Sequence, residues 1–194
     1  MKPRRLLIID GHPDPGPDRF AHALADSYAR GAAVSGHEVR RIAVSELEFS
    51  LLGSRHDWEG EYIDFDIRHA QEAISWAEHI VILYPLWLGD MPALLKGFFE
   101  QVMRPKFAFH AREGKPPEKA LKGRSALMVV TMGMPAIFYR FYFGAHSVKS
   151  LERNILKFVG IGPVRHLLIG NVEGDADSRE GWLQELFGLG EAGQ

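Results

Sequence analysis

The sequence contains no cysteine. This absence excludes disulfide bonds, thiolate nucleophiles, redox-active thiols and thiolate metal ligands, so any redox chemistry must come from a bound cofactor. No apolar run approaches the roughly 18 residues that a transmembrane helix requires, and the run Leu6–Ile9 is too short for a signal peptide. We therefore expect a cytoplasmic protein without membrane insertion.

An excess of charge of either sign is absent as well. The 23 basic residues nearly balance the 25 acidic ones, and no run of five or six Lys or Arg residues occurs. Such a balance provides no electrostatic surface for nucleic acid, and it gives no support for the acidic docking face of a one-electron carrier protein. We expect a small-molecule partner and no nucleic acid.

The motifs of several enzyme classes are missing. The loop after the first apolar run has neither G-x-G-x-x-G nor G-K-[ST], which disfavours a dinucleotide fingerprint and nucleoside triphosphate hydrolysis. A G-x-S-x-G nucleophile elbow is absent. Nine histidines are present, but none forms an H-x-x-x-H pair, so we expect no metal site.

Five segments have the pattern of β-strands. Continuous apolar runs predict central strands that are buried on both faces, and more polar runs predict strands near a sheet edge. In chain order the predicted strands cover residues 6–9, 38–44, 80–84, 126–131 and 164–169.

Segments with apolar residues at helical spacing alternate with these strands. They cover residues 20–35, 67–77, 92–104 and 148–159, followed by a short closing helix around residues 182–187. We expect irregular structure over residues 45–65 and 106–123 and disorder over residues 190–194. The alternation predicts a single α/β domain, residues 1–194, with a parallel sheet and a ligand site at the carboxyl ends of its strands.

The loop after the first strand runs from Gly11 directly into a helix. A helix amino end favours anions through its free amides and its dipole, so a phosphate can bind there with His12 and Arg19 as side-chain donors. The alternative is that Asp18 caps the helix and that the prolines only stiffen the turn.

The loops after the third and fourth strands are apolar and contain glycine. Leu86, Trp87 and Leu88 suit a flat aromatic ligand, and core packing is the alternative. Thr131, a flexible glycine and two methionines follow the fourth strand. The aromatic run 138–143 comes next, and it suits either a ligand or a dimer contact.

Taken together, these loops resemble the NAD(P)H:quinone oxidoreductase family, including its potassium-efflux ancillary and modulator-of-drug-activity types. The resemblance extends from Leu6 to about Gly162. It rests on an ordered set of short motifs, which are GHPDP (11–15), WAEHIV (76–81), PLW (85–87), PALLKG (92–97), FAF (107–109) and VTMG (130–133).

The resemblance implies a flavodoxin-like, three-layer, doubly wound fold with a five-stranded parallel sheet of strand order 2-1-3-4-5. It also implies a flavin, FAD or FMN, with NAD(P)H as electron donor, and the motif at residues 92–97 inclines us to FAD. The implied cofactor-binding residues are His12, Asp18, Arg19, Phe20, Pro85, Leu86, Trp87, Leu88, Thr131, Met132 and Gly133.

The resemblance assigns catalytic roles to Tyr139 and His146, which would hydrogen-bond the reduced flavin. It assigns substrate contacts to Met134 and to Phe109, an aromatic lid residue supplied by the partner subunit of a homodimer with sites at its interface. The implied function is ping-pong reduction of quinones or similar flat acceptors by two-electron hydride transfer. The alternative is a regulatory flavoprotein subunit of a potassium-efflux membrane system.

Overall fold

The structure, a computed structural model, describes residues 2–174 and 176–194. Its centre is a parallel sheet of five strands in the order β2-β1-β3-β6-β7. The strands are β1 (Arg5–Asp10), β2 (Glu38–Ala43), β3 (His79–Pro85), β6 (Ser125–Thr131) and β7 (Val164–Ile169). This confirms the expected α/β class and the predicted order 2-1-3-4-5 of the five principal strands.

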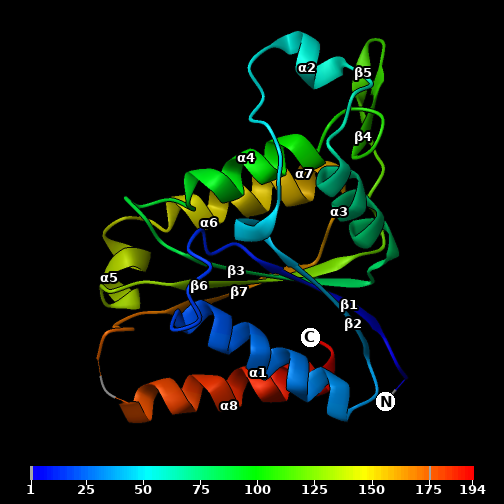
Figure 1. The fold of residues 1–194 in the computed structure, drawn as a ribbon. Coiled ribbons are helices and arrows are strands. Elements are labelled where there is room, and N and C mark those ends of the chain that lie inside the picture. Colours follow the sequence, from blue (N-terminus) through cyan, green and yellow to red (C-terminus); the bar gives the residue numbers. More distant parts are fainter. Residues whose placement is uncertain (1, 175) are drawn as a thin grey trace.

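Helices cover both faces of the sheet and give the molecule three layers (Figure 1). One face carries α1 (Phe20–Val34) and α8 (Ala176–Ala192). The other face carries α3 (Phe65–Trp76), α4 (Ala93–Val102) and a continuous helical segment made of α6 (His146–Ser150), the π-helical turn η2 (Leu151–Leu156) and α7 (Lys157–Val159). The remaining short helices are η1 (Val44–Glu46), α2 (Arg55–Glu59) and α5 (Ala136–Phe141).

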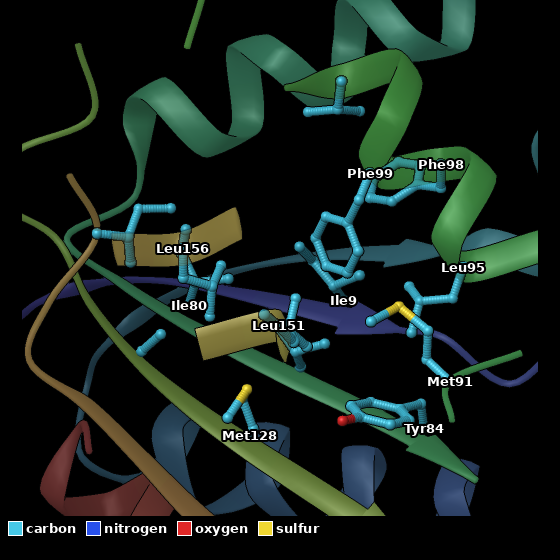
Figure 2. Packing of buried hydrophobic residues seen from close by; sticks show 14 of the residues in the cluster. Ile9, Ile80, Tyr84, Met91, Leu95, Phe98, Phe99, Met128, Leu151 and Leu156 are labelled. Carbon is cyan, nitrogen blue, oxygen red and sulfur yellow. The ribbon is translucent and has the colours of Figure 1, made fainter. Parts of the chain in front are cut away.

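The burial of the strands explains their sequence pattern. All seven residues of β3 are buried because helices cover both faces of the central strands. Alternate residues of β1 point to opposite faces, so Leu7 and Ile9 join the core beneath α3 and α4 while Leu6 and Ile8 join the core beneath α1 and α8. Figure 2 shows the first of these cores.

The segment predicted to be irregular at residues 106–123 contains an antiparallel hairpin, so that prediction was wrong. It consists of β4 (Phe109–Arg112) and β5 (Lys115–Lys119). Gly114 has φ 66° in the connecting turn, a conformation that glycine adopts at little cost. Pro116 and Pro117 lie in β5, an edge strand of this two-stranded ribbon, where a missing amide donor is tolerated.

The closing helix is longer than predicted, and the expected disorder at residues 190–194 is also wrong, because α8 continues to Ala192. The glycines near its end do not break the helix, and one of them, Gly190, allows α8 to pack closely on α1. A Cβ added to Gly190 would lie 2.1 Å from the carbonyl oxygen of Tyr28, and one added to Gly31 would lie 2.0 Å from that of Phe187. Ser27 donates a hydrogen bond of 2.7 Å to the carbonyl oxygen of Leu183 across the same contact.

The two ends of the described chain meet at the amino ends of the strands. The Arg4 guanidinium donates to the carbonyl oxygen of Gly193 at 2.5 Å. His37 accepts a hydrogen bond from the Arg4 amide at 3.1 Å. Its other ring nitrogen lies 3.1 Å from the carbonyl oxygen of Glu191. These contacts fix the end of α8 against the start of β1.

Candidate functional site

The loops that follow β1, β3 and β6 converge on one edge of the sheet because these three strands are neighbours. The Gly11 amide donates to the carbonyl oxygen of Leu83 at 2.7 Å, and the Leu86 amide donates to that of Thr131 at 2.8 Å. The rings of His12 and Trp87 lie 6.1 Å apart in edge-to-face contact. The structure thus brings residues from all three predicted loops together.

The first helix begins without a side-chain cap. Its N-cap residue is Arg19, and the Arg19 side chain makes no capping hydrogen bond to the first turn. Asp18 is exposed and is not the cap, so the alternative that Asp18 caps this helix is wrong. Among the described residues the Phe20 and Ala21 amides of the first turn have no hydrogen-bond partner, whereas the His22 amide donates to the carbonyl oxygen of Arg19 at 3.0 Å. Two open amides at a helix amino end suit an anion.

The carboxylate of Asp14 already binds several donors of this loop. It accepts hydrogen bonds from the Gly16 amide at 2.8 Å and from Arg19 Nε at 2.9 Å. It also forms an ion pair with Arg19 Nη2 at 2.7 Å. The Gly16 amide and the Arg19 guanidinium lower the pKa of Asp14. An incoming phosphate would compete with this carboxylate for Arg19.

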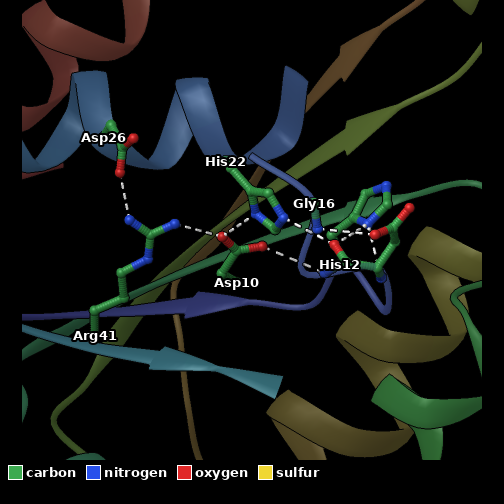
Figure 3. A network of polar contacts seen from close by, with 7 residues as sticks. Asp10, His12, Gly16, His22, Asp26 and Arg41 are labelled. Atoms are coloured by element: carbon green, nitrogen blue, oxygen red, sulfur yellow. Dashed lines mark hydrogen bonds and ion pairs between the residues drawn. The ribbon is translucent and has the colours of Figure 1, made fainter. Parts of the chain in front are cut away.

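A buried ion network holds the base of the loop (Figure 3). The Asp10 side chain is completely buried and lies 2.6 Å from both Arg41 Nη2 and His22 Nδ1. Arg41 also forms an ion pair with Asp26, and His22 Nε2 lies 2.9 Å from the carbonyl oxygen of Asp14. The network fixes the position of the loop. A hollow of about 410 Å³, lined in part by Asp10 and Arg41, lies beside it.

The sequence did not identify His22, Arg41 and Asp26 as site residues. Arg41 lies on β2, and its partner Asp10 ends β1, the neighbouring strand. The only signal in the sequence was a carboxylate at the end of a buried strand, because such a group needs a cationic partner.

His12 was predicted as a site residue. Burial lowers the pKa of its ring, so the neutral form is favoured.

The loop after β3 forms a tight turn that exposes two apolar side chains. The amides and carbonyls of Trp87 and Asp90 form reciprocal hydrogen bonds of 2.8 and 3.0 Å. Between them, Leu88 has φ 50° and Gly89 has φ 82°. Leucine is uncommon in this left-handed conformation. Leu88 is fully exposed and Trp87 half-exposed, whereas the predicted contacts Leu86 and Pro85 are half-buried and buried.

The loop after β6 exposes fewer of its predicted residues. Thr131 and Met132 are buried, Met134 is half-buried and Gly133 is exposed. Met132 packs in the core beneath α4, and its amide donates to the carbonyl oxygen of Ile169 at 2.9 Å. Of the contacts predicted in this loop, Gly133 is the exposed one, so a ligand can approach its backbone directly.

The two predicted catalytic residues differ in exposure. His146 is exposed at the start of α6. Tyr139 is buried in α5, and its hydroxyl lies 2.6 Å from Ser147 Oγ. In the free chain, therefore, the Tyr139 hydroxyl does not reach the open edge of the sheet. The surface of α5 instead exposes Ile137, Phe138 and Phe141, and the exposed Tyr142 follows directly.

The structure does not bring Phe109 to the other predicted site residues within one chain. Phe109 lies in β4 and packs edge-on against Phe158 with 5.1 Å between the ring centroids. The hairpin lies beyond the opposite end of the sheet from α5 (Figure 1). Only the Phe109 of a second copy could therefore reach this edge, and its role stays a prediction.

Neither a cluster of metal ligands nor a membrane-spanning helix occurs in the part of the chain that the structure describes. Over residues 2–174 and 176–194, no three His, Cys, Asp or Glu side chains gather as a metal site would require. No helix within those ranges has the length and apolar character needed to cross a bilayer.

Comparison with known proteins gives consistent matches. A family model described as Flavodoxin-like fold matches residues 4–186. An NAD(P)H oxidoreductase of Haemophilus influenzae is 26% identical over 170 residues, which cover 86% of this chain and 83% of that protein. NAD(P)H dehydrogenase (quinone) 1 of Rattus norvegicus is 26% identical, with 96% of this chain and 77% of that protein covered. The solved NAD(P)H:quinone oxidoreductase of Methanothermobacter marburgensis has a TM-score of 0.82 at 22% identity and covers 100% of both chains.

Two further relatives have names that bear on cofactor and role. FMN-dependent NADH:quinone oxidoreductase 1 of Bradyrhizobium diazoefficiens is 28% identical, with 54% of this chain and 50% of that protein covered. The glutathione-regulated potassium-efflux system ancillary protein KefF of Enterobacter sp. is 32% identical, with 66% of this chain and 60% of that protein covered.

Proposed function

The chain belongs to the flavodoxin-like fold family, and from that premise we propose that it is a flavin-dependent NAD(P)H dehydrogenase that reduces quinones or similar flat acceptors. The observation that carries the proposal is the convergence of an uncapped helix amino end and an exposed aromatic turn on one sheet edge. Relatives named as quinone-reducing NAD(P)H dehydrogenases supply the reaction class.

The residues at this edge suit the two chemically different parts of a flavin. The open Phe20 and Ala21 amides of α1, together with Arg19, suit its phosphate. Trp87 and Leu88 present apolar surface for its ring, and the exposed backbone of Gly133 allows close approach at the ring edge. Either FMN or FAD satisfies this pattern. The FMN-dependent relative favours FMN, whereas the motif at residues 92–97 had inclined us to FAD.

When bound, the flavin supplies two-electron hydride transfer between NAD(P)H and the acceptor. The protein's contribution is positional and electrostatic. Trp87 and Leu88 exclude water from one side of a flat slot, and His146, which is exposed at the start of α6, can hold or donate a proton. We expect donor and acceptor to occupy this slot in turn, which gives ping-pong kinetics. In a homodimer, the partner's Phe109 would close the slot.

The test is the visible spectrum of the purified protein before and after anaerobic addition of NADPH or NADH. We expect flavin absorption that bleaches with reduced nicotinamide and returns when a quinone is added. Mass analysis of the released cofactor then distinguishes FMN from FAD. A colourless protein that takes up neither flavin would overturn the proposal.

The alternative function is a regulatory flavoprotein, which the KefF relative favours. Such a subunit would bind a membrane partner and turn over slowly. Steady turnover with soluble menadione-like quinones supports the enzyme. Copurification with a membrane transport protein, together with negligible turnover, supports the regulator.

The contacts of Asp14 and Arg19 predict opposite effects on flavin affinity. We expect Arg19→Ala to weaken flavin binding about tenfold, because it removes a charge-assisted contact to phosphate. We expect Asp14→Asn to tighten binding about threefold, because it weakens a half-exposed ion pair that competes for Arg19. Titration of flavin-free protein with FMN and FAD, followed by fluorescence quenching, measures both.

Asp18→Asn is the matched control, since it removes the same charge from the exposed residue that precedes Arg19 in the chain, whereas the ion pair of Arg19 among the described residues is with Asp14. If Asp14→Asn and Asp18→Asn change affinity equally, the effect is general electrostatics and Asp14 does not compete for Arg19.

A further inference from the structure

A pair of buried hydroxyl groups joins α5 to α6. The Tyr139 hydroxyl and Ser147 Oγ lie 2.6 Å apart, and both side chains are almost completely buried. Ser147 directly follows His146, which is exposed. The buried bond thus lies one residue from the group that the proposed function assigns to proton transfer.

The turn between the two helices is under backbone strain. Gly144 has φ 63° and Ala145 has φ 48°, so an alanine is held in the left-handed region. The Ala145 amide donates to the carbonyl oxygen of Tyr139 at 3.2 Å. A Cβ added to Gly144 would lie 3.2 Å from His146 Nε2, so the His146 ring lies against this turn. A strained turn persists only when surrounding contacts hold it, and the Tyr139–Ser147 bond is the side-chain hydrogen bond, buried at both ends, that joins its two flanking helices.

A third hydroxyl beside this pair provides an internal comparison. Tyr84, in β3, is completely buried and close to both Tyr139 and Ser147. Its hydroxyl makes no hydrogen bond of ordinary geometry among the described residues. Burial raises its pKa, and the nearby Ser147 hydroxyl opposes that shift only in part. Removing the Tyr84 hydroxyl should therefore cost less than removing either member of the Tyr139–Ser147 pair, whose 2.6 Å contact is the well-formed one.

We propose that Ser147 is a positioning residue whose hydrogen bond with Tyr139 fixes the α5–α6 turn and thereby holds the His146 ring at the carboxyl edge of the sheet. This inference rests on the proposed function for the part that His146 plays in turnover. This inference assigns the Tyr139 hydroxyl a positioning role beneath the site, for which the hydroxyl does not need to touch the flavin. The packing of α5 against β3 would then determine where His146 points.

The first test uses flavin-free protein, so that it does not depend on turnover. We expect Ser147→Ala and Tyr139→Phe each to speed amide hydrogen exchange at residues 144–148 about fivefold, and to shift the ring proton resonances of His146 in the same direction. The double variant should show no further change, because both substitutions remove one bond. Tyr84→Phe should leave exchange and resonances as in the unchanged protein.

The second test uses the flavin-loaded protein. We expect the pH profile of the NAD(P)H-to-quinone rate to change alike in Ser147→Ala and Tyr139→Phe, with flavin affinity retained, and to stay unchanged in Tyr84→Phe. Unaltered exchange and His146 resonances in Ser147→Ala, or equal changes in Tyr84→Phe, would overturn the positioning role. If the unchanged protein neither binds flavin nor turns over while the first test succeeds, the proposed function fails and the positioning role of Ser147 stands.

Discussion

Alanine at Gly190 is expected to lower the free energy of unfolding by about 3 kcal/mol. The added Cβ would lie 2.1 Å from the carbonyl oxygen of Tyr28 and 2.9 Å from the amide nitrogen of Ala32, both of which belong to the backbone of α1. Backbone atoms of a buried helix cannot rotate aside as a side chain does, so α8 must move away from α1. That movement opens the core that Leu186 fills.

Gly188→Ala is the matched control, because it lies on the same helix and an added Cβ meets no atom within 4 Å. It should stabilise the protein by about 0.5–1 kcal/mol, the usual gain when alanine replaces glycine in a helix interior. Urea unfolding followed by circular dichroism measures both variants. If Gly190→Ala is as stable as Gly188→Ala, the close contact of α1 with α8 does not constrain the fold.

The second large effect is a loss of stability in mild acid caused by His79. Burial, together with the charges of Arg4 and Arg165, lowers the pKa of His79 to about 4. Its Nδ1 lies 2.7 Å from Ser125 Oγ, and its buried Nε2 has no partner among the described residues. Between pH 6.5 and 4 the unfolded chain binds a proton here that the folded chain does not, so stability falls as the pH is lowered through this window. The expected loss is about 3 kcal/mol.

His79→Gln should reduce this dependence, since glutamine can still bond Ser125 but does not titrate in this range. Urea unfolding at several pH values between 4 and 7 gives the slope for both proteins, and the carboxylates that titrate in both cancel in the comparison. Equal slopes would contradict the prediction. A ring titration by NMR, with a midpoint near 6.5 for His79, would contradict it independently.

The sequence predicted the central sheet well because its strands have strong local signals. A continuous apolar run such as Ile80–Leu83 has no stable place except between two covering layers. The loops that follow β1, β3 and β6 were located for the same reason, since strand order places their carboxyl ends together. Trp87 and Leu88 were correctly predicted to lie on such a loop.

The predictions that failed, and the contacts that were missed, depend on partners distant in the sequence. Glycines near residue 190 indicated an ending, yet Gly190 lies within α8 and serves a contact with α1 more than 150 positions earlier. Asp10 and Arg41 pair only because β1 and β2 are neighbours. The burial of Tyr139 likewise depends on Ser147 and β3, which an isolated aromatic run does not reveal.

The contact between Arg4 and Gly193 has a practical consequence for mounting the protein on a surface. Both residues lie at the amino ends of the strands, whereas the candidate site lies at the carboxyl ends of the same strands, at the opposite edge of the sheet. A molecule tethered to an electrode through a linker at either position would present the same orientation, with the candidate site facing the solution. For the proposed flavoenzyme, a soluble quinone mediator, rather than direct contact with the electrode, would then carry current to that site.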